Sequence, residues 1–186
     1  DPIMFHQPVN THIELITSED AGYGLVQTTE APDEFYGRVY NMGGGPSCRV
    51  VFIDYMGRMM KMFGLGDAKK IMPLNWFGIR NFHCGWYEDS DVLNNYLGHW
   101  RHSLEDHYKE VEASIPWYLH ILKPCTQITP SAITGPFARA FMRRMADPLH
   151  WIETNDEEKV KAFFGSRQKW EAIQGWKDYV LQPSDP

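Results

Sequence analysis

The stretch from residue 80 to residue 83 holds the side chains best suited to bind a ligand. Arg80 is followed by Asn81 and, two positions later, by His83, just before an aromatic cluster. A guanidinium group holds a phosphate or diphosphate through two parallel hydrogen bonds, which a single ammonium group cannot do. The pattern therefore indicates a phosphate-binding loop. Its aromatic continuation consists of Trp86 and Tyr87.

The same arginine also has an ordinary structural explanation. Glu88 and Asp89 follow it within ten residues, and exposed arginines commonly form ion pairs with such carboxylates on a protein surface. The residues alone favour this surface ion pair, so the phosphate-binding hypothesis needs support from the rest of the chain.

Local motifs elsewhere in the sequence predict no catalytic residue and no metal site. Neither a G-x-S-x-G nucleophile motif nor a Walker loop occurs. His83 and Cys84 are adjacent, and adjacent side chains on an extended segment point to opposite faces. Three histidines lie close together in the sequence, but no carboxylate completes a recognisable ligand set. They are His99, His102 and His107.

A glycine-rich turn stands between two predicted elements. Residues 35–40 are rich in aromatic and β-branched side chains, which predicts a strand. Gly43, Gly44 and Gly45 follow, and apolar residues then recur at helical spacing from 50 to 63. Strand, glycine turn and helix form half of a βαβ unit, where ligands bind at the carboxyl edge of the sheet. The alternative is a tight turn alone, since the glycines do not fit G-x-G-x-x-G.

The remaining pattern predicts an α/β front and a helical back. Short strands are expected at 13–16 and 74–79. Helices are expected at 18–30, 88–97, 103–122 with a break at Pro116, 137–145, 155–164 and 166–173. The predicted fold class is therefore α/β and helix-rich.

Composition excludes several kinds of partner. The net charge of −6 argues against nucleic acid, because phosphate backbones are bound by cationic faces. No apolar run of about 18 residues occurs, so a membrane-spanning segment is not expected. Three cysteines without metal-type spacing suit reduced thiols and a cytoplasmic location. Because the chain begins at Asp1, it is either processed or a piece of something longer.

Four stretches in order resemble the extended short-chain dehydrogenase/reductase family, which includes NAD(P)-dependent nucleotide-sugar epimerases and dehydratases. Val39–Gly45 is similar to the family's Y-N-hydrophobic-G-x-G strand and turn. The others are Ser18-Glu19-Asp20 after a short strand, Arg80 followed by Leu97-Gly98-His99-Trp100, and Ser103-Leu104-Glu105-Asp106. The likeness covers about residues 11–122.

The chain also departs from the family pattern. The dinucleotide glycine motif and the Tyr-x-x-x-Lys pair, both in the first half of such enzymes, are absent. Asp91-Val92 replaces the family's Ser-Lys, and Arg101-His102 replaces the proline after Trp100, which leaves the particular sugar nucleotide open. The resemblance therefore implies a carboxyl-terminal portion with the last Rossmann strand or strands, in which the parent enzyme binds NAD or NADP elsewhere.

The resemblance also implies roles for the residues first considered. Arg80 would contact phosphate of a sugar-nucleotide-like substrate, and Asn81, His83, Trp86 and Tyr87 would line the pocket. This chain alone would bind no cofactor and catalyse no reaction. A homodimer is one possible assembly. Residues 1–124 would form the family part and residues 125–186 a helical extension. The alternative hypothesis is a stand-alone helix-rich binding or interaction module.

Overall fold

The computed structural model describes residues 2–80, 85–117, 131–173 and 175–176. The protein is a helix-rich α/β chain, and its described part contains one two-stranded sheet. The chain divides into two compact units. The first unit consists of residues 1–11, 51–83 and 115–186, and the second unit consists of residues 12–50 and 84–114.

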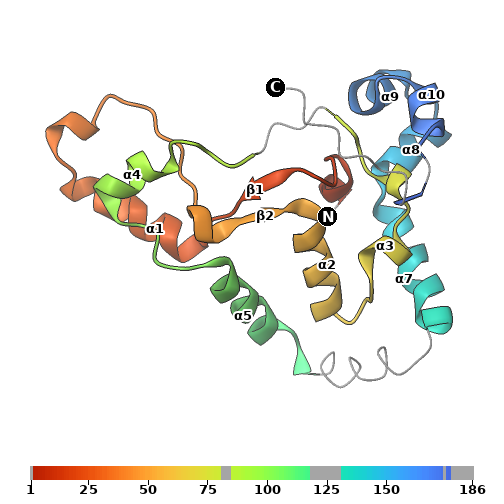
Figure 1. Ribbon diagram of the computed structural model, residues 1–186, viewed down its shortest axis with the longest axis horizontal. Helices are drawn as coiled ribbons and strands as arrows, with labels where there is room; N and C mark the ends of the chain where they lie inside the picture. Colours follow the sequence, from red (N-terminus) through yellow and green to blue (C-terminus); the bar gives the residue numbers. More distant parts are fainter. Residues whose placement is uncertain (1, 81–84, 118–130, 174, 177–186) are drawn as a thin grey trace. The chain divides into compact units, whose positions relative to one another are not determined.

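The second unit is built around a short sheet in which strand β1 (His12–Glu14) pairs with strand β2 (Arg49–Val51), whose last residue already belongs to the first unit. Figure 1 shows this pair between the labels β1 and β2. The helices of the second unit are α1 (Ser18–Gln27), α4 (Ser90–Leu97) and α5 (Leu104–Ser114), with 3₁₀ turns at Thr28–Glu30, Asp33–Phe35 and Pro46–Cys48.

Helix α1 starts as its sequence predicts, with the cap one residue earlier. The side chain of Thr17, rather than Ser18, accepts a hydrogen bond from the backbone N–H of Asp20 at 3.1 Å. Such a cap satisfies one of the amide groups that have no partner inside the helix. The helix ends at Gln27, and the remaining predicted turn, Thr28–Glu30, is a 3₁₀ helix.

The strand predicted at residues 35–40 does not form. The chain instead makes a 3₁₀ turn at Asp33–Phe35, and the ring of Tyr40 stacks on Phe35 with centroids 4.9 Å apart. Val39 is 97% exposed and has no strand neighbour in the described part of the second unit. A strand needs a neighbouring strand to pair its backbone groups, and residue propensity alone does not supply one.

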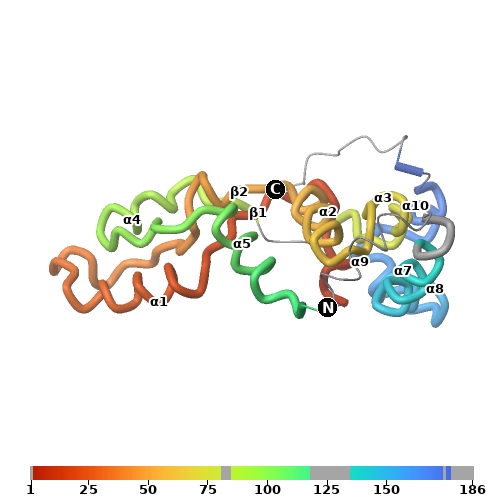
Figure 2. Tube along the Cα trace, turned by 90° about the horizontal axis from the view of Figure 1, so that it is seen from below, coloured from red at the N-terminus to blue at the C-terminus, as the bar shows by residue number. Residues whose placement is uncertain are grey.

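The first unit is helical. Figures 1 and 2 show α7, α8 and α9 following one another, with α3 beside α7. The elements are the 3₁₀ helix Pro2–Phe5, α2 (Phe52–Met62), α3 (Ala68–Ile71), the 3₁₀ helix Leu74–Trp76, α7 (Ser131–Met145), α8 (Asp147–Glu153), α9 (Glu157–Phe164) and α10 (Arg167–Glu171).

One sequence expectation for the first unit is wrong, and one helix was not predicted. Residues 74–79 were expected as a strand, but a 3₁₀ turn lets Phe77 become fully buried, with its ring centroid 5.0 Å from that of Phe5. Asp147 and Pro148 follow the end of α7 at Met145, which confirms the expected end of that helix. They also begin α8, because proline is well suited to the first helical turn, where its missing N–H has no helical partner.

Aromatic side chains form the core of the first unit. Trp151, Val160 and Phe164 make one buried cluster, against which Ile79 and Trp170 pack. Two helices of this region have side-chain caps where the sequence predicts them, since Asp156 caps α9 and Ser166 caps α10. The predicted division between residues 124 and 125 falls outside the described residues and stays a prediction.

Candidate functional site

Arg80 lies in the first unit, on a segment that the core holds in place. The backbone N–H of Ile79 donates to the carbonyl of Phe163 at 3.0 Å, which fixes the chain beside the end of α9. The side chain of Arg80 is exposed, and within the described residues of the first unit it forms no ion pair with a carboxylate. Its guanidinium is therefore available to an anion.

Trp86 and Tyr87 lie in the second unit, next to the sheet. The ring of Trp86 stacks on His12 of β1, with centroids 4.3 Å apart and planes 22° apart. The guanidinium carbon of Arg49 lies 5.4 Å from the centre of the Trp86 ring. Because Trp86 remains 43% exposed, the cluster of His12, Arg49, Trp86 and Tyr87 offers an aromatic and cationic surface to a ligand.

Glu14 connects two members of this cluster, Arg49 and Tyr87, through hydrogen bonds. Its side chain is completely buried, and its carboxylate accepts hydrogen bonds from Arg49 Nε and the backbone N–H of Gly45, both at 2.9 Å, and from the N–H of Tyr87 at 3.3 Å. Burial works to raise the pKa of Glu14, but hydrogen bonds from Ser90, Arg49 and the two amides outweigh burial and lower the pKa. The carboxylate thus stays ionised and fixes Arg49.

The glycine turn at residues 43–45 is buried and tightly packed. A Cβ atom added to Gly43 would collide with the carboxylate of Glu14. Gly45 has a φ of 76°, and a Cβ there would lie 2.5 Å from the ring of Trp100. Glycine is required at these positions because of close contact and, at Gly45, because of a left-handed backbone.

The amide groups of this turn already have partners. The N–H of Gly44 donates to the carbonyl of Leu15 at 2.9 Å, and the N–H of Gly45 donates to Glu14 at 2.9 Å. A phosphate-binding glycine loop instead directs its amides at the ligand. The turn therefore serves packing within the second unit, which is the tight-turn alternative of the sequence analysis.

The carbonyl of Gly43 links the turn to the segment before α5. It accepts one hydrogen bond from Nε2 of His99 at 3.0 Å and a second from Nε1 of Trp100 at 2.9 Å. A carbonyl oxygen only accepts, so the bond from His99, which is completely buried, requires the proton on Nε2. Nδ1 of His99 is buried and has no hydrogen-bond partner.

Asp20 and His102 form the second link between distant stretches. The Asp20 carboxylate, 1% exposed, accepts from the N–H groups of Arg101 at 3.1 Å and His102 at 2.9 Å, and from Nδ1 of His102 at 2.6 Å. Burial works to raise the pKa of Asp20, but these hydrogen bonds outweigh burial and lower the pKa. The hydrogen bond to Asp20, aided by the charges of Asp20 and Glu19, raises the pKa of His102.

His99, His102 and the buried Cys48 form hydrogen bonds within the second unit. Among the residues that the structure describes, no group of three His, Cys, Asp or Glu side chains could hold a metal ion. The Cys48 thiol donates to the carbonyl of His102 at 3.5 Å, and burial raises the pKa of this thiol. A protonated, buried thiol is a poor nucleophile.

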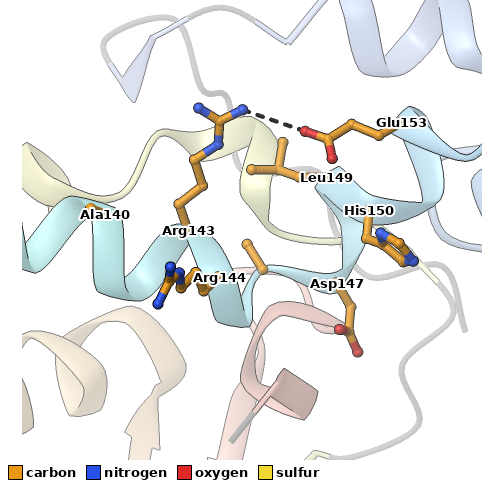
Figure 3. Close-up of a pocket in the computed structure, with 8 residues that line it drawn as sticks. Ala140, Arg143, Arg144, Asp147, Leu149, His150 and Glu153 are labelled. Atoms are coloured by element: carbon orange, nitrogen blue, oxygen red, sulfur yellow. Dashed lines mark hydrogen bonds and ion pairs between the residues drawn. The ribbon is translucent and has the colours of Figure 1, made fainter.

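A hollow of about 610 Å³ lies beside the junction of α7 and α8 in the first unit. Figure 3 shows Arg143 reaching to Glu153 across this hollow, with nitrogen and oxygen 3.4 Å apart. Asp147 lies on α8, as Glu153 does, and its carboxylate is hydrogen-bonded to Nε2 of His6 at 2.9 Å. The remaining lining consists of Ala140, Arg144, Ala146, Leu149 and His150.

The structure brings together part of the predicted site and adds residues to it. Trp86 and Tyr87 share one cluster, Arg80 belongs to the other unit, and Asn81 and His83 lie outside the described residues. Glu14 and Arg49 also belong to this cluster, although no local sequence motif marks them. The sequence offers one indication for Glu14: it lies two positions after His12, and alternate residues of a strand share a face.

Comparison with known proteins adds no relative. The chain matches none of the protein-family models, curated proteins or solved structures with which it was compared. In the part of the chain that the structure describes, no helix combines the length and the apolar character needed to cross a membrane. The fold and the site together define a helix-rich α/β protein with an aromatic and cationic surface on its second unit.

Proposed function

We propose that this chain is the substrate-binding carboxyl-terminal portion of an NAD(P)-dependent epimerase/dehydratase-type oxidoreductase. The parent enzyme belongs to the extended short-chain dehydrogenase/reductase family and acts in the cytoplasm on a sugar-nucleotide-like substrate. NAD or NADP and the Tyr/Lys acid–base pair reside in another part of the parent enzyme. The chain by itself is not catalytic.

The observation that supports this proposal is the meeting of distant stretches in the second unit. Asp20, the glycine turn and the segment 99–102 carry the resemblance to the family, and they are separated by up to about eighty residues. All three are joined by hydrogen bonds through Asp20 and the carbonyl of Gly43. Stretches that resemble one family and depend on one another in three dimensions are expected of a shared structural unit.

The surface of the second unit suits a sugar. An exposed tryptophan ring packs well against the apolar face of a sugar, and a guanidinium nearby supplies hydrogen bonds to hydroxyl groups. Trp86 presents such a ring, and Glu14 holds Arg49 beside it. In the first unit, Arg80 is the candidate for the phosphate groups.

The exposed segment around Val39 also fits a detached portion. Tyr36 has extended dihedral angles, with φ −76° and ψ 155°, and Val39 is almost fully exposed. In the proposed parent enzyme a neighbouring strand of the Rossmann sheet covers this segment. Covering Val39 removes apolar surface from water, which favours the assembled state.

A titration with reduced nicotinamide cofactors tests whether the cofactor binds in another part of the parent enzyme and not in this chain. The chain alone should leave the fluorescence of NADH and NADPH unchanged. A longer chain with roughly 150 or more preceding residues, enough for a dinucleotide-binding half, should bind one of them. Tight binding of either cofactor by the isolated chain would contradict the proposal.

A second candidate function is a stand-alone binding module. Phe137 and Phe141 lie four positions apart on α7 and are 80% and 52% exposed, so they share a helix face that a partner protein could cover. A stand-alone module should be monodisperse and unfold cooperatively. A detached portion should bind an apolar dye or self-associate, and size-exclusion chromatography with dye fluorescence separates the two.

A further inference from the structure

Two cationic side chains meet beside Gly165, at the C-terminal end of α9. A Cβ atom on Gly165 would lie 3.3 Å from Nη1 of Arg80 and 3.5 Å from Nζ of Lys169. Since both distances start from one point, the two nitrogen atoms lie within the reach of a single phosphate group, whose oxygens accept charge-assisted hydrogen bonds of about 2.7–2.9 Å.

Both side chains are carried by segments that are anchored to the core of the first unit. Arg80 follows Ile79, which packs against the buried Trp151 cluster and donates its N–H to Phe163. Lys169 lies on α10, where the next residue, Trp170, donates from Nε1 to the carbonyl of Asn75 at 2.9 Å. The backbones that present the two cations are therefore positioned before any ligand binds.

Within the part of the first unit that the structure describes, neither cation pairs with a carboxylate. Two other cations on α9 and α10 have carboxylate partners: Arg167 pairs with Glu157 at 2.7 Å and Lys159 with Asp156 at 3.4 Å. Among the described residues of the first unit, Arg80 and Lys169 have no such partner. Two nearby positive charges repel each other, and a bound anion removes that repulsion.

Gly165 leaves room between the two cations. Its φ of 80° allows the chain to turn from α9 into α10, and it places no side chain between the guanidinium and the ammonium group. The ordinary explanation is that both cations only stabilise the end of α9, where the last carbonyl groups carry partial negative charge. The two explanations differ in what removal of Lys169 does to anion binding.

We infer that Arg80 and Lys169 form one binding site for a phosphate or diphosphate group. The identification of this group as the diphosphate of a nucleotide sugar rests on the proposed function. The site gives the helical region after residue 125, which has no counterpart in the family resemblance, a part in binding the substrate. Arg80 supplies a two-pronged contact and Lys169 a point charge.

Isothermal titration of the chain with inorganic pyrophosphate tests the site. Arg80→Ala and Lys169→Ala should each weaken the affinity at least fivefold. Lys70→Ala is the matched control, because Lys70 is an exposed lysine on α3 of the same unit and forms no ion pair with any residue that the structure describes in this unit. The affinity of the Lys70→Ala variant for pyrophosphate should stay within twofold of that of the unchanged chain.

Two results would overturn the inference. One is the absence of pyrophosphate binding by the unchanged chain at millimolar concentration. The other is a Lys169→Ala variant that binds pyrophosphate normally, whether or not its unfolding temperature falls, because Lys169 would then only stabilise the end of the helix. Either result leaves the nicotinamide titration, and with it the proposed function, unaffected.

A second probe, UDP-glucose, distinguishes the sources of the phosphate. Competition between UDP-glucose and pyrophosphate, lost in Lys169→Ala, supports the site as a diphosphate site for a nucleotide sugar. Binding of pyrophosphate without UDP-glucose supports the two-cation site and contradicts the sugar-nucleotide part of the proposed function. The two failures are thus separable.

Discussion

The two units of this protein are stabilised by different interactions. In the first unit, buried aromatic and aliphatic side chains such as Phe77, Trp151 and Phe164 form the core. In the second unit, two buried carboxylates, Glu14 and Asp20, accept hydrogen bonds from stretches that are far apart in the sequence. Apolar contacts are many and weak individually, whereas each hydrogen bond to a buried charge is specific and costly to lose.

This difference indicates where the sequence is most constrained. An apolar core tolerates exchange among side chains of similar volume. A buried carboxylate that accepts several amide hydrogen bonds tolerates almost no exchange, because any replacement leaves donors without a partner. Asp20, the glycine turn and residues 99–102, which carry part of the family resemblance, lie in the second, less tolerant kind of environment.

The largest effect is expected from a cavity in the first unit. Phe164→Ala removes a fully buried ring and should lower the free energy of unfolding by about 4 kcal/mol. Phe141→Ala, on an exposed face of α7, should change it by less than about 0.5 kcal/mol. Denaturant unfolding followed by tryptophan fluorescence provides both values. Equal losses in the two variants would show that the first unit has no defined core.

A smaller but still large effect is expected at the glycine turn of the second unit. Gly45→Ala must fit a Cβ against Trp100 at a φ of 76°, and should cost about 3 kcal/mol. Gly22→Ala, inside α1 and with open space around it, should instead stabilise the protein by about 0.5–1 kcal/mol.

Thermal unfolding of these two glycine variants measures whether their effects on stability have opposite signs. Opposite signs support close packing as the reason for glycine at the turn. A harmless Gly45→Ala would mean that the turn is loose and that the second unit is less constrained than the comparison of the two units requires.

The third effect tests the buried carboxylate directly. Asp20→Asn keeps the shape of the side chain but removes the charge that Arg101 and His102 contact, and should cost about 2 kcal/mol. Asp33→Asn, at an exposed position of the same unit, is the control and should be close to neutral. Amide exchange at residues 99–103 should quicken in the first variant only. Unchanged exchange there would contradict the anchoring role of Asp20.

The smallest effect is a dependence of stability on pH. The pKa of His102 is raised from its ordinary 6.5, so its contribution is complete below pH 6.5 and is lost as pH rises through the folded value. The pKa of Asp20 is lowered from 3.8, so its contribution is complete above pH 3.8 and is lost as pH falls through the folded value. The pair is therefore most stabilising between these two pH values.

Unfolding temperatures measured from pH 4 to pH 8 check this window. The unchanged chain should lose stability above pH 6.5 more steeply than His102→Gln, which has no titrating group at that position. Parallel curves for the two chains would show that His102 is not coupled to Asp20 in solution.

Helices with clear apolar spacing and capping residues were predictable from the sequence. The structure confirms the helices at α1, α2, α4, α9 and α10, since capping and periodicity are local properties. The predicted strands at 35–40 and 74–79 were wrong because strand formation depends on a partner elsewhere in the chain. Strand β2 was not predicted, because a strand of three residues directly before a helix is too short to show the alternation of apolar and polar residues.

The candidate site was predictable only in part, for a similar reason. Trp86 and Tyr87 could be recognised as an aromatic pair, and Arg80 as an exposed guanidinium. The roles of Glu14, Arg49 and Lys169 depend on contacts across tens of residues in sequence, which no local pattern records. The structure thus adds the residues that position the predicted ones.

The binding of reduced nicotinamide tests the central claim most directly. Fluorescence titration with NADH and NADPH compares this chain with a longer chain that carries the dinucleotide-binding half assigned to the proposed parent enzyme. The proposal predicts no binding by the chain alone and one bound cofactor per longer chain. Tight binding by the chain alone, or none by the longer chain, would contradict it.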